Sequence, residues 1–437
     1  MKHTLRRILT PTLMCAVTAL SAQDRGISLF NNTQIYTGRN PALPFPKEFV
    51  IGLPEGAGSL VLETGKGPWL IDRADGGKDF SLASGWAGLE KNNYFIDGEW
   101  KVRTFFLGKK WKYGQLGLSH EWEGHSSLRF NKDLVGLLGF GNYGYLQVEP
   151  RASSQPLDLK SEGEHFIFQA FTLQSALFRN KWSVGAAVRY LGGIQDFHTD
   201  ILKLKADIRD PLVLKMEEDW SFYSADLVET FSVDSIRLSK SNGLAPGRHP
   251  GFAFSIGVQY KAPRWRAALQ LKDLGSIRWR KGNRFSRSGN TLYQGIQGID
   301  FLNLNENIFD QVRDTLHALA GVEKSEASFT RSLPASLLAE NQVYFSDRWT
   351  VGFSADYIFS RDYGYLMAGA VYRPFPIWSF GGQMSLDTRK DWNLGLLTSL
   401  ELGVFNLFFA TDHVPALWKL NKADRLQARF GLALMWD

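Results

Sequence analysis

One short device recurs along this chain. A strand-like run ends at a tight turn, and a tryptophan, usually preceded by a basic residue, opens the next run. A soluble sheet has no reason to place tryptophan at one fixed end of successive hairpins, whereas indole rings suit the lipid–headgroup boundary around a membrane barrel. The device therefore predicts a membrane barrel with a periplasmic-side aromatic girdle. With the tryptophan near the C-terminus, the predicted girdle comprises Trp111, Trp182, Trp265, Trp349, Trp378 and Trp436.

The runs between these turns alternate in polarity. In residues 251–261 and 349–359, mostly large apolar side chains occupy every second position, and small or polar ones lie between them. Each run has the length of about ten residues that a tilted strand needs to cross the hydrocarbon core. We expect the apolar face to contact lipid and the other face to line a lumen. A large soluble β-sandwich is the alternative, but it does not require aromatic residues at both strand ends.

Placing every Trp-bearing turn on one side gives each strand a direction and a total of about fourteen strands, an even number as in single-chain bacterial barrels. We therefore predict an all-β fold, a transmembrane antiparallel up-and-down β-barrel. The tight turns are assigned to the periplasm, and long connections near 123–164, 198–250 and 280–334 to the cell exterior. These connections are expected to hold a short helix at 131–138, a projecting hairpin in the second, and a helix at 304–319.

The N-terminus has the composition of a secretory signal. Basic residues at the start precede an apolar stretch at 8–19, so residues 1–22 are expected to be cleaved off. Cys15, the only cysteine, would leave with them, which excludes disulfides from the mature chain. Cys15 also raises the option of a lipoprotein signal, which Met14 before it fits poorly. The mature chain is then predicted to comprise a plug segment at 23–46 and a barrel at 47–437, in the outer membrane of a Gram-negative bacterium.

A short element follows the predicted signal. The residues Asn40, Pro41, Ala42 and Leu43 resemble the Asn-Pro-Ala element near the mature N-terminus of FadL-like outer-membrane barrels. The resemblance implies a fourteen-stranded barrel whose N-terminal segment is a lumen plug. Its members include long-chain fatty-acid channels and PorV-like accessory barrels of the type IX secretion system. The residues themselves fix an extended entry and stop a helix, as an ordinary N-terminal turn would also do.

Several further motifs are spread over the mature chain. They are Asn131-Lys132-Asp133-Leu134, Gly141-Asn142, the runs 184–193 and 273–279, Leu333-Pro334-Ala335 and Ala410-Thr411-Asp412. In order and spacing they resemble a Bacteroidota family of outer-membrane barrels that carries only an unknown-function label. This resemblance implies fold and location, and very little chemistry. In the run 273–279, Gly275 is expected to permit a β-bulge rather than to form a ligand site.

The sequence offers no pattern for catalysis. No histidine pair has a metal-binding spacing, and neither a nucleophile elbow nor a phosphate loop is present. Ser119 and His120 are adjacent and point to opposite faces of a strand, so they cannot form a nucleophile–base pair. Glu121, Glu123 and His125 share a face and are interpreted as a solvated rim rather than a cation site. We expect a non-enzymatic protein with no cofactor, no metal and, since its charges are interspersed, no nucleic-acid partner.

Charged residues on the polar strand faces are the remaining lead. If they lie together they should pair and close the interior, and if they lie apart they should line a wet channel. The lumen candidates are Arg103, Arg189, Arg266, Asp356, Glu401 and Arg429.

The leading functional hypothesis is passage or capture of a small hydrophobic compound. The alternative is a non-transporting scaffold that binds a protein partner, as PorV-like barrels do for secretion machinery. The expected partners are outer-membrane lipid, the barrel-insertion machinery acting on the C-terminal strand that ends near Trp436, and either a small hydrophobic ligand or a secretion-machinery protein.

Overall fold

The computed structural model describes most of the chain from residue 40 onward. The described residues are 40–63, 70–72, 78–80, 86, 89, 93–149, 152, 154–209, 214–231, 236–238, 248–293, 321–361, 363–388, 392–414 and 425–437. The predicted signal peptide, most of the predicted plug segment and the helix predicted at 304–319 lie outside these residues.

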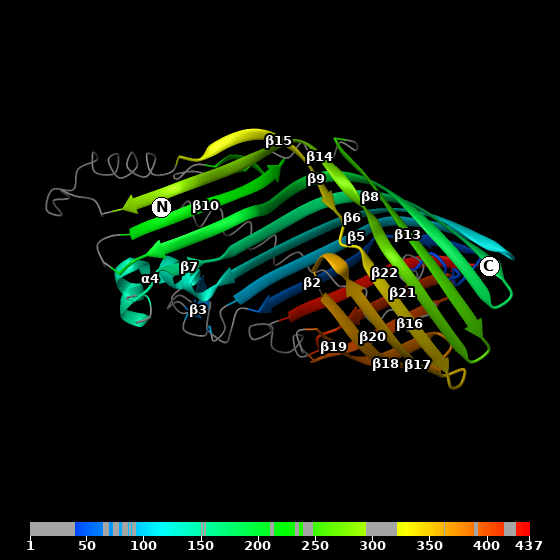
Figure 1. Cartoon of the computed structure of the whole chain (residues 1–437). Coiled ribbons are helices and arrows are strands. Elements are labelled where there is room, and N and C mark those ends of the chain that lie inside the picture. Colours follow the sequence, from blue (N-terminus) through cyan, green and yellow to red (C-terminus); the bar gives the residue numbers. More distant parts are fainter. Residues whose placement is uncertain are drawn as a thin grey trace.

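A closed, antiparallel fourteen-stranded barrel forms the body of the molecule (Figure 1). Its first wall position is shared by two consecutive strands, β1 and β2, which pair with the last strand and close the ring at Phe49 and Trp436. The prediction of an all-β barrel with fourteen strands is therefore confirmed. The wall strands are β1 (Phe49–Gly52) with β2 (Glu55–Glu63), β5 (Asn93–Trp111), β6 (Gly114–Asn131), β8 (Ser161–Arg179), β9 (Trp182–Asp207), β13 (His249–Ala262), β14 (Trp265–Tyr293), β16 (Ser336–Tyr344), β17 (Trp349–Ile358), β18 (Tyr363–Phe375), β19 (Trp378–Asp387), β20 (Trp392–Leu402), β21 (Phe405–Thr411) and β22 (Arg425–Trp436).

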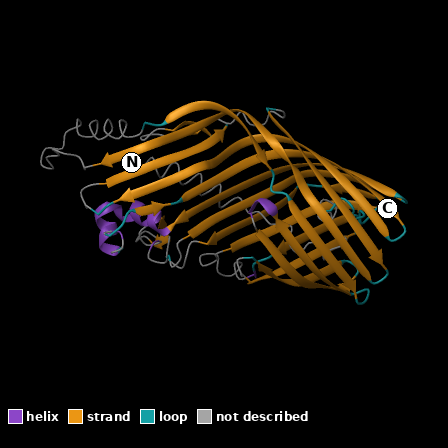
Figure 2. Cartoon of the chain, in the orientation of Figure 1, coloured by secondary structure: helices purple, strands orange, loops and turns teal. Residues whose placement is uncertain are grey.

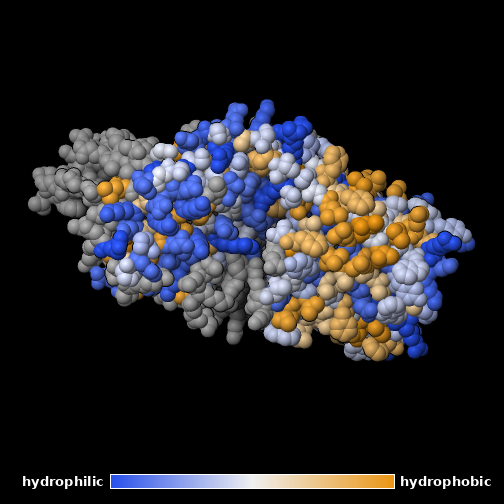
Figure 3. Space-filling view, viewed as in Figure 1, coloured by the Kyte–Doolittle hydropathy of each residue, from blue (hydrophilic) through white to orange (hydrophobic). Residues whose placement is uncertain are grey.

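The strands alternate in burial as their sequences alternate in polarity. On β19, for example, Phe380 and Met384 are exposed on the outer face, while Gln383 between them is buried in the interior. Repeated around the ring, this pattern puts an apolar belt on the outside of the barrel, visible as the orange surface in Figure 3. An apolar exterior around a polar interior reverses the arrangement of a soluble protein.

The six predicted girdle tryptophans lie at the tight-turn end of this belt, each between 37% and 55% exposed. Neighbouring aromatics join them into stretches of contact: Trp182 lies 4.9 Å from Tyr260, and Trp349 lies 4.6 Å from Tyr372, measured between ring centroids. An aromatic rim made of several such stretches therefore borders the apolar belt at the turns. Its assignment to the periplasmic side stays a prediction.

One half of the wall is much taller than the other (Figure 2). β9 and β14 contain 26 and 29 residues, whereas β19 contains 10. Beyond the apolar belt β9 and β14 pair with β10 (Leu214–Ala225), and β15 (Glu323–Ser332) and β7 (Leu157–Leu159) add to this projecting half-wall. The hairpin of β9 and β10 is the one predicted in the second long connection. Much of each predicted long connection is thus paired strand.

The helix α4 (Lys132–Val148) caps the far end of the projecting half-wall. Its N-cap is Asn131, whose side-chain oxygen accepts a hydrogen bond from the Leu134 backbone N–H. The helix is longer than the 131–138 expected, and its Tyr145 packs with Leu157, Leu159 and Ala206 in a buried apolar cluster.

None of the helices in the described ranges is long and apolar enough to cross a membrane. The remaining elements are β3 (Leu70–Asp72) with β4 (Lys78–Phe80), β11 (Val228–Phe231) with β12 (Ile236–Leu238), and the short 3₁₀-helix η3 (Phe359–Arg361).

Candidate functional site

The segment from Asn40 to Phe45 lies against the inner wall near the tight-turn end. The buried Gln115 on β6 holds it: its Nε2 donates to the Leu43 carbonyl at 2.8 Å, and its Oε1 accepts from the Phe45 N–H at 2.7 Å. On β9, the Ser183 hydroxyl donates to the Ala42 carbonyl at 2.7 Å. Inward-facing polar side chains therefore satisfy the backbone of this segment, which begins with a turn closed by the Leu43 N–H donating to the Asn40 carbonyl at 3.0 Å. Pro41 and Pro44 keep it from forming a helix.

Two glycines make room for this segment. A Cβ on Gly185 would lie 2.3 Å from the Pro41 carbonyl carbon, and one on Gly257 would lie 2.0 Å from Asn40 Oδ1. Both glycines face inward, where the sequence pattern predicted small residues. The four predicted plug residues are thus buried against the wall, and Asn40 donates from Nδ2 to the Leu269 carbonyl at 3.4 Å. Whether 23–46 fills the lumen depends on residues outside the described part of the chain and stays a prediction.

A buried ion-pair network occupies the interior above this segment. Glu55 on β2 accepts from Arg103 Nη1 at 3.0 Å and from Arg429 Nη2 at 2.9 Å, so one carboxylate links β2, β5 and β22. Arg103 also donates from Nε to Glu121 Oε1 at 2.8 Å. Arg429 comes from the last strand and the other three side chains from the first three wall positions, and all four are buried.

The network continues around the wall through Arg189. Its guanidinium contacts Asp273 Oδ1 at 2.6 Å, Glu121 Oε2 at 3.5 Å, and Glu123. Lys101 Nζ lies 2.6 Å from Glu121 and 3.0 Å from Glu123. The interpretation of Glu121 and Glu123 as a solvated rim was therefore wrong: Glu121 is 4% exposed and surrounded by cations. Inward-facing residues on other strands supply the neutralising charges, and the sequence of β6 alone does not reveal them.

The six predicted lumen candidates divide into two groups. Arg103, Arg189 and Arg429 belong to the one network, as the pairing alternative required. Arg266 is buried elsewhere, beside Tyr344 and Glu340. Asp356 and Glu401 are half-buried, and Glu401 lies 3.9 Å from Arg373 near the tight-turn end. The sequence reasoning missed Glu55, Lys101 and Asp273 as partners; its only relevant signal was the predicted bulge beside Asp273, which has a positive φ of 57°.

A second charged cluster lies nearer the mouth. Arg331 on β15 contacts Asp196 at 3.0 Å and also contacts Glu164. His125 lies between two carboxylates, with Nε2 2.6 Å from Glu164 and Nδ1 3.4 Å from Glu99. The half-wall strands therefore bring acidic, basic and imidazole groups together where the barrel opens into its projecting half.

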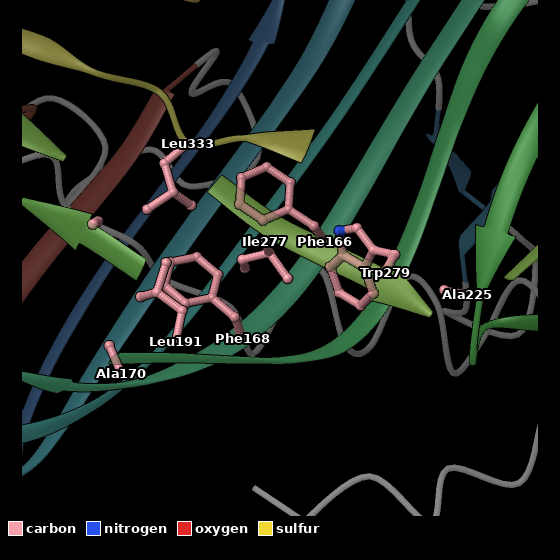
Figure 4. Close-up of a cluster of buried hydrophobic side chains, with 9 residues drawn as sticks. Phe166, Phe168, Ala170, Leu191, Ala225, Ile277, Trp279 and Leu333 are labelled. Atoms are coloured by element: carbon pink, nitrogen blue, oxygen red, sulfur yellow. The ribbon is translucent and has the colours of Figure 1, made fainter. Parts of the chain in front are cut away.

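An apolar cluster, drawn in Figure 4, contacts both charged groups. Arg189 lies 5.8 Å from the ring centroid of Phe168, and Arg331 lies 4.6 Å from that of Phe166, so a cation borders the cluster on each side. Trp279, fully buried, fits against Gly193, where a Cβ would lie 2.7 Å from its ring. The cluster comprises Phe166, Phe168, Ala170, Leu191, Ala225, Ala253, Ile277, Trp279 and Leu333.

A cavity of about 400 Å³ adjoins this cluster on the mouth side. Phe166 belongs to the cluster and also lines the cavity, beside Arg331, so it forms the boundary between the two. The other lining is mostly polar and includes His198, Arg129, Glu162 and Ser127. An amphipathic space of this size, partly walled by an aromatic ring, suits a small molecule.

Ser119 and His120, the adjacent pair considered in the sequence, point to opposite faces of β6. Ser119 is buried on the inner face, whereas His120 lies among the outward aromatics, with Nδ1 2.8 Å from the Thr104 hydroxyl. Within the described ranges no three His, Cys, Asp or Glu side chains are grouped to hold a metal ion.

Comparison with known proteins gives a family and several distant structures. The model described as "Family of unknown function (DUF5723)" matches residues 41–412. No curated protein matches the sequence. Among solved structures, the Ralstonia pickettii toluene transporter TbuX is similar at 10% identity and a TM-score of 0.46, with 93% of this chain and 94% of that chain covered. The CymD monoaromatic hydrocarbon channel is similar at 12% identity and a TM-score of 0.43, with coverage of 95% and 96%. At such identities and scores, the similarity does not identify a cargo.

Proposed function

We propose a function on the premise that this chain belongs to DUF5723, a family of unknown function. The chain is an outer-membrane barrel that captures a small hydrophobic compound at its mouth and passes it inward without covalent chemistry. The outward apolar belt and the aromatic rim at its turn end support the membrane location, because both match what a bilayer requires of a barrel wall. The predicted signal peptide agrees with this location.

One observation carries the proposed capture: the apolar cluster inside the barrel adjoins the mouth cavity through Phe166. Barrel interiors are generally polar, so an inward-facing patch of phenylalanine, tryptophan and leucine needs an explanation. A ligand leaving water would bury apolar surface against these side chains, while the polar lining of the cavity could satisfy a heteroatom.

The same interior opposes free diffusion. The buried ion-pair network around Glu55, Arg103 and Arg189 joins several strands inside the barrel. Residues 40–45 lie farther from the mouth, on the inner wall near the tight turns. With residues 23–46 acting as a plug, a captured compound would need a gated or lateral route. We therefore expect the barrel to exclude small hydrophilic solutes that an open porin would pass.

The capture is tested with an apolar fluorescent probe, N-phenyl-1-naphthylamine, whose emission rises when it leaves water. The reconstituted wild-type protein should bind the probe saturably, and Phe166→Ala should weaken binding, because the truncation removes the aromatic ring from the cavity lining. Phe252→Ala is the matched control, because Phe252 is 62% exposed on the outer face and reports only on partitioning into lipid.

The comparison is valid if both variants keep the fold, seen as the heat-modifiable gel mobility of closed barrels. Equal probe affinity in wild type and Phe166→Ala would overturn capture at this site. The uptake rate of the probe by cells expressing each variant then tests passage: it should fall in Phe166→Ala and not in Phe252→Ala.

The scaffold function remains the second candidate because of the projecting half-wall. This half-wall extends well past the apolar belt, and its paired strands β9, β10, β14 and β15 form a surface for a protein partner. Purification from native membranes separates the two functions. A recurrent protein partner with no co-purifying small molecule would favour the scaffold, and a bound apolar compound would favour capture.

A further inference from the structure

The tight-turn end of the barrel carries an uneven charge distribution. The chain start at 47–48, the turns at 109–113, 179–182 and 261–265, and Asp437 together hold eight basic and only two acidic side chains. The tight turns on the other half of the same rim hold two basic residues, Arg348 and Arg373, and two acidic ones, Asp347 and Glu401, so their charges balance. We name the eight basic residues the basic arc: Lys47, Lys109, Lys110, Lys112, Arg179, Lys181, Lys261 and Arg264.

The basic arc is continuous in space. The Lys110 N–H donates to the Glu48 carbonyl at 2.7 Å, the Phe178 N–H to the Tyr113 carbonyl at 2.9 Å, and the Lys261 N–H to the Lys181 carbonyl at 2.7 Å. Backbone hydrogen bonds thus join each of these segments to the next. The cations therefore form one contiguous sector of the rim and not isolated surface charges.

Most of the basic arc has no acidic partner among the described residues. Lys47 pairs with Asp437 at 2.5 Å, and Lys110 donates to the Phe45 carbonyl at 2.7 Å. The side chains at Lys109, Lys112, Arg179, Lys181 and Arg264 are exposed, and no described carboxylate lies within ion-pair distance of them. Like charges so close together repel one another unless anions from outside the chain neutralise them.

The basic arc coincides with the aromatic rim. Lys109 Nζ lies 5.0 Å from the centroid of Phe49, which stacks on Trp436 at 5.7 Å. Trp182, Tyr260 and Trp265 form the next stretch of rim, directly beside Lys181 and Arg264. Indole rings mark the headgroup level of a bilayer, and long basic side chains there can extend toward lipid phosphates.

We propose that the basic arc is a binding surface for anionic phospholipid headgroups in the leaflet that surrounds the Trp-bearing turns. The proposal rests on the membrane location given above and is independent of the cargo. Charge, exposure and position at the headgroup level all fit a lipid phosphate, and near a membrane each basic residue strengthens attraction to anionic lipid. An acidic soluble protein is the competing partner and is an outcome of the experiment below.

The test compares two variants, each lacking four positive charges. The arc variant removes half of the basic arc and carries Lys109→Gln/Lys112→Gln/Lys181→Gln/Arg264→Gln. The hairpin variant removes four exposed charges from β9, β10 and their connection, far from the rim, and carries Lys203→Gln/Lys205→Gln/Arg209→Gln/Lys215→Gln. Each protein is inserted into phosphatidylcholine vesicles with or without a minor fraction of phosphatidylglycerol and then extracted in mild detergent. Mass spectrometry gives the ratio of the two lipids that remain bound.

Wild type and the hairpin variant should retain phosphatidylglycerol at about fivefold or more above its fraction in the vesicle, which is the share that one basic residue supplies. The arc variant keeps four of the eight basic residues and should therefore retain phosphatidylglycerol at a lower enrichment than the hairpin variant, and raising the salt concentration should lower the wild-type enrichment. Wild-type insertion without enrichment, or equal enrichment in both variants, would overturn the lipid surface alone, even if an acidic protein bound there. Failure of the wild type to insert into either vesicle would instead overturn the membrane location itself.

Discussion

Glu55 and Arg429 are separated by 374 residues in the sequence and joined by a buried ion pair, with Arg429 Nη2 2.9 Å from Glu55 Oε1. The second oxygen of the same carboxylate binds Arg103. The strand that opens the barrel, its neighbour and the strand that closes it therefore meet at one side chain. Main-chain pairing of β2 with β22 closes the ring, and this carboxylate fixes it from the inside.

Glu55→Gln should destabilise the barrel more than any exposed charge change. The substitution puts a neutral amide in place of the carboxylate that Arg429 and Arg103 share, and Arg103 keeps a second carboxylate, that of Glu121. Breaking a buried ion pair costs about 3–5 kcal/mol. The free energy of unfolding in denaturant, measured in detergent micelles, checks the size of the loss. The control is Glu217→Gln, whose partner Lys205 lies 3.6 Å away with both side chains exposed, and which should cost under about 1 kcal/mol. Equal losses in the two variants would contradict a structural role for the closing carboxylate.

The barrel wall was predictable because its strands obey one local rule. The runs 251–261 and 349–359 were expected as strands, and β13 and β17 match them to within two residues at each end. Alternating apolar and polar residues between tight turns leave little freedom of register. β9 continues to Asp207 in the hairpin that was predicted for the second long connection, and beyond the apolar belt neither of its faces contacts lipid. There the alternation that marks a membrane strand is no longer required.

The interior was predictable by face but not by partner. Arg103, Arg189 and Arg429 were assigned inward from the strand period alone. Their partners Glu55 and Asp273 follow from the spatial neighbourhood of strands that are distant in the sequence, which a local pattern does not contain. The apolar cluster was missed for a related reason: Phe166 and Trp279 lie inside the expected strands but beside bulges that shift the register, which a local alternation does not reveal.

Gly185→Ala should displace the segment from Asn40 to Phe45. The new Cβ would lie 2.3 Å from the Pro41 carbonyl carbon and oxygen, and backbone atoms cannot move aside as a flexible side chain can. We expect a loss of about 1–3 kcal/mol from overpacking, together with increased conductance in planar bilayers as the segment leaves the wall. Gly382→Ala is the control, since its nearest atom would be 3.9 Å away. A stable variant with unchanged conductance would argue against the plug.

His165 should make the projecting half-wall sensitive to acid. Burial lowers the pKa of His165 to about 4, Asp196 opposes this shift, and His125 and Arg331 add to it. Between pH 6.5 and 4 the unfolded chain binds a proton that folded His165 does not, so stability is fully present above pH 6.5 and falls as the pH drops toward 4. Each pKa unit corresponds to about 1.4 kcal/mol, which sets an upper limit of about 3 kcal/mol.

Thermal unfolding midpoints between pH 4 and 7.5 check the His165 prediction. His165→Gln keeps a side chain that can bond to the Ser126 hydroxyl, now 2.7 Å from His165 Nδ1, but cannot take up a proton. The variant should lose less stability than wild type over the acidic range and match it near pH 7.5. Parallel curves would assign the acid sensitivity to other groups.

Single cysteines should report which end of the barrel faces outward. Lys203 on β9 and Lys181 in a Trp-bearing turn are both exposed, and the predicted signal removes the only native cysteine. If the projecting half-wall is extracellular, a membrane-impermeant maleimide will label Lys203→Cys on intact cells. It will label Lys181→Cys only after the outer membrane is permeabilised. The reverse pattern would invert the sidedness of the whole barrel: the aromatic rim and the basic arc would then lie in the outer leaflet, and the mouth cavity would open to the periplasm.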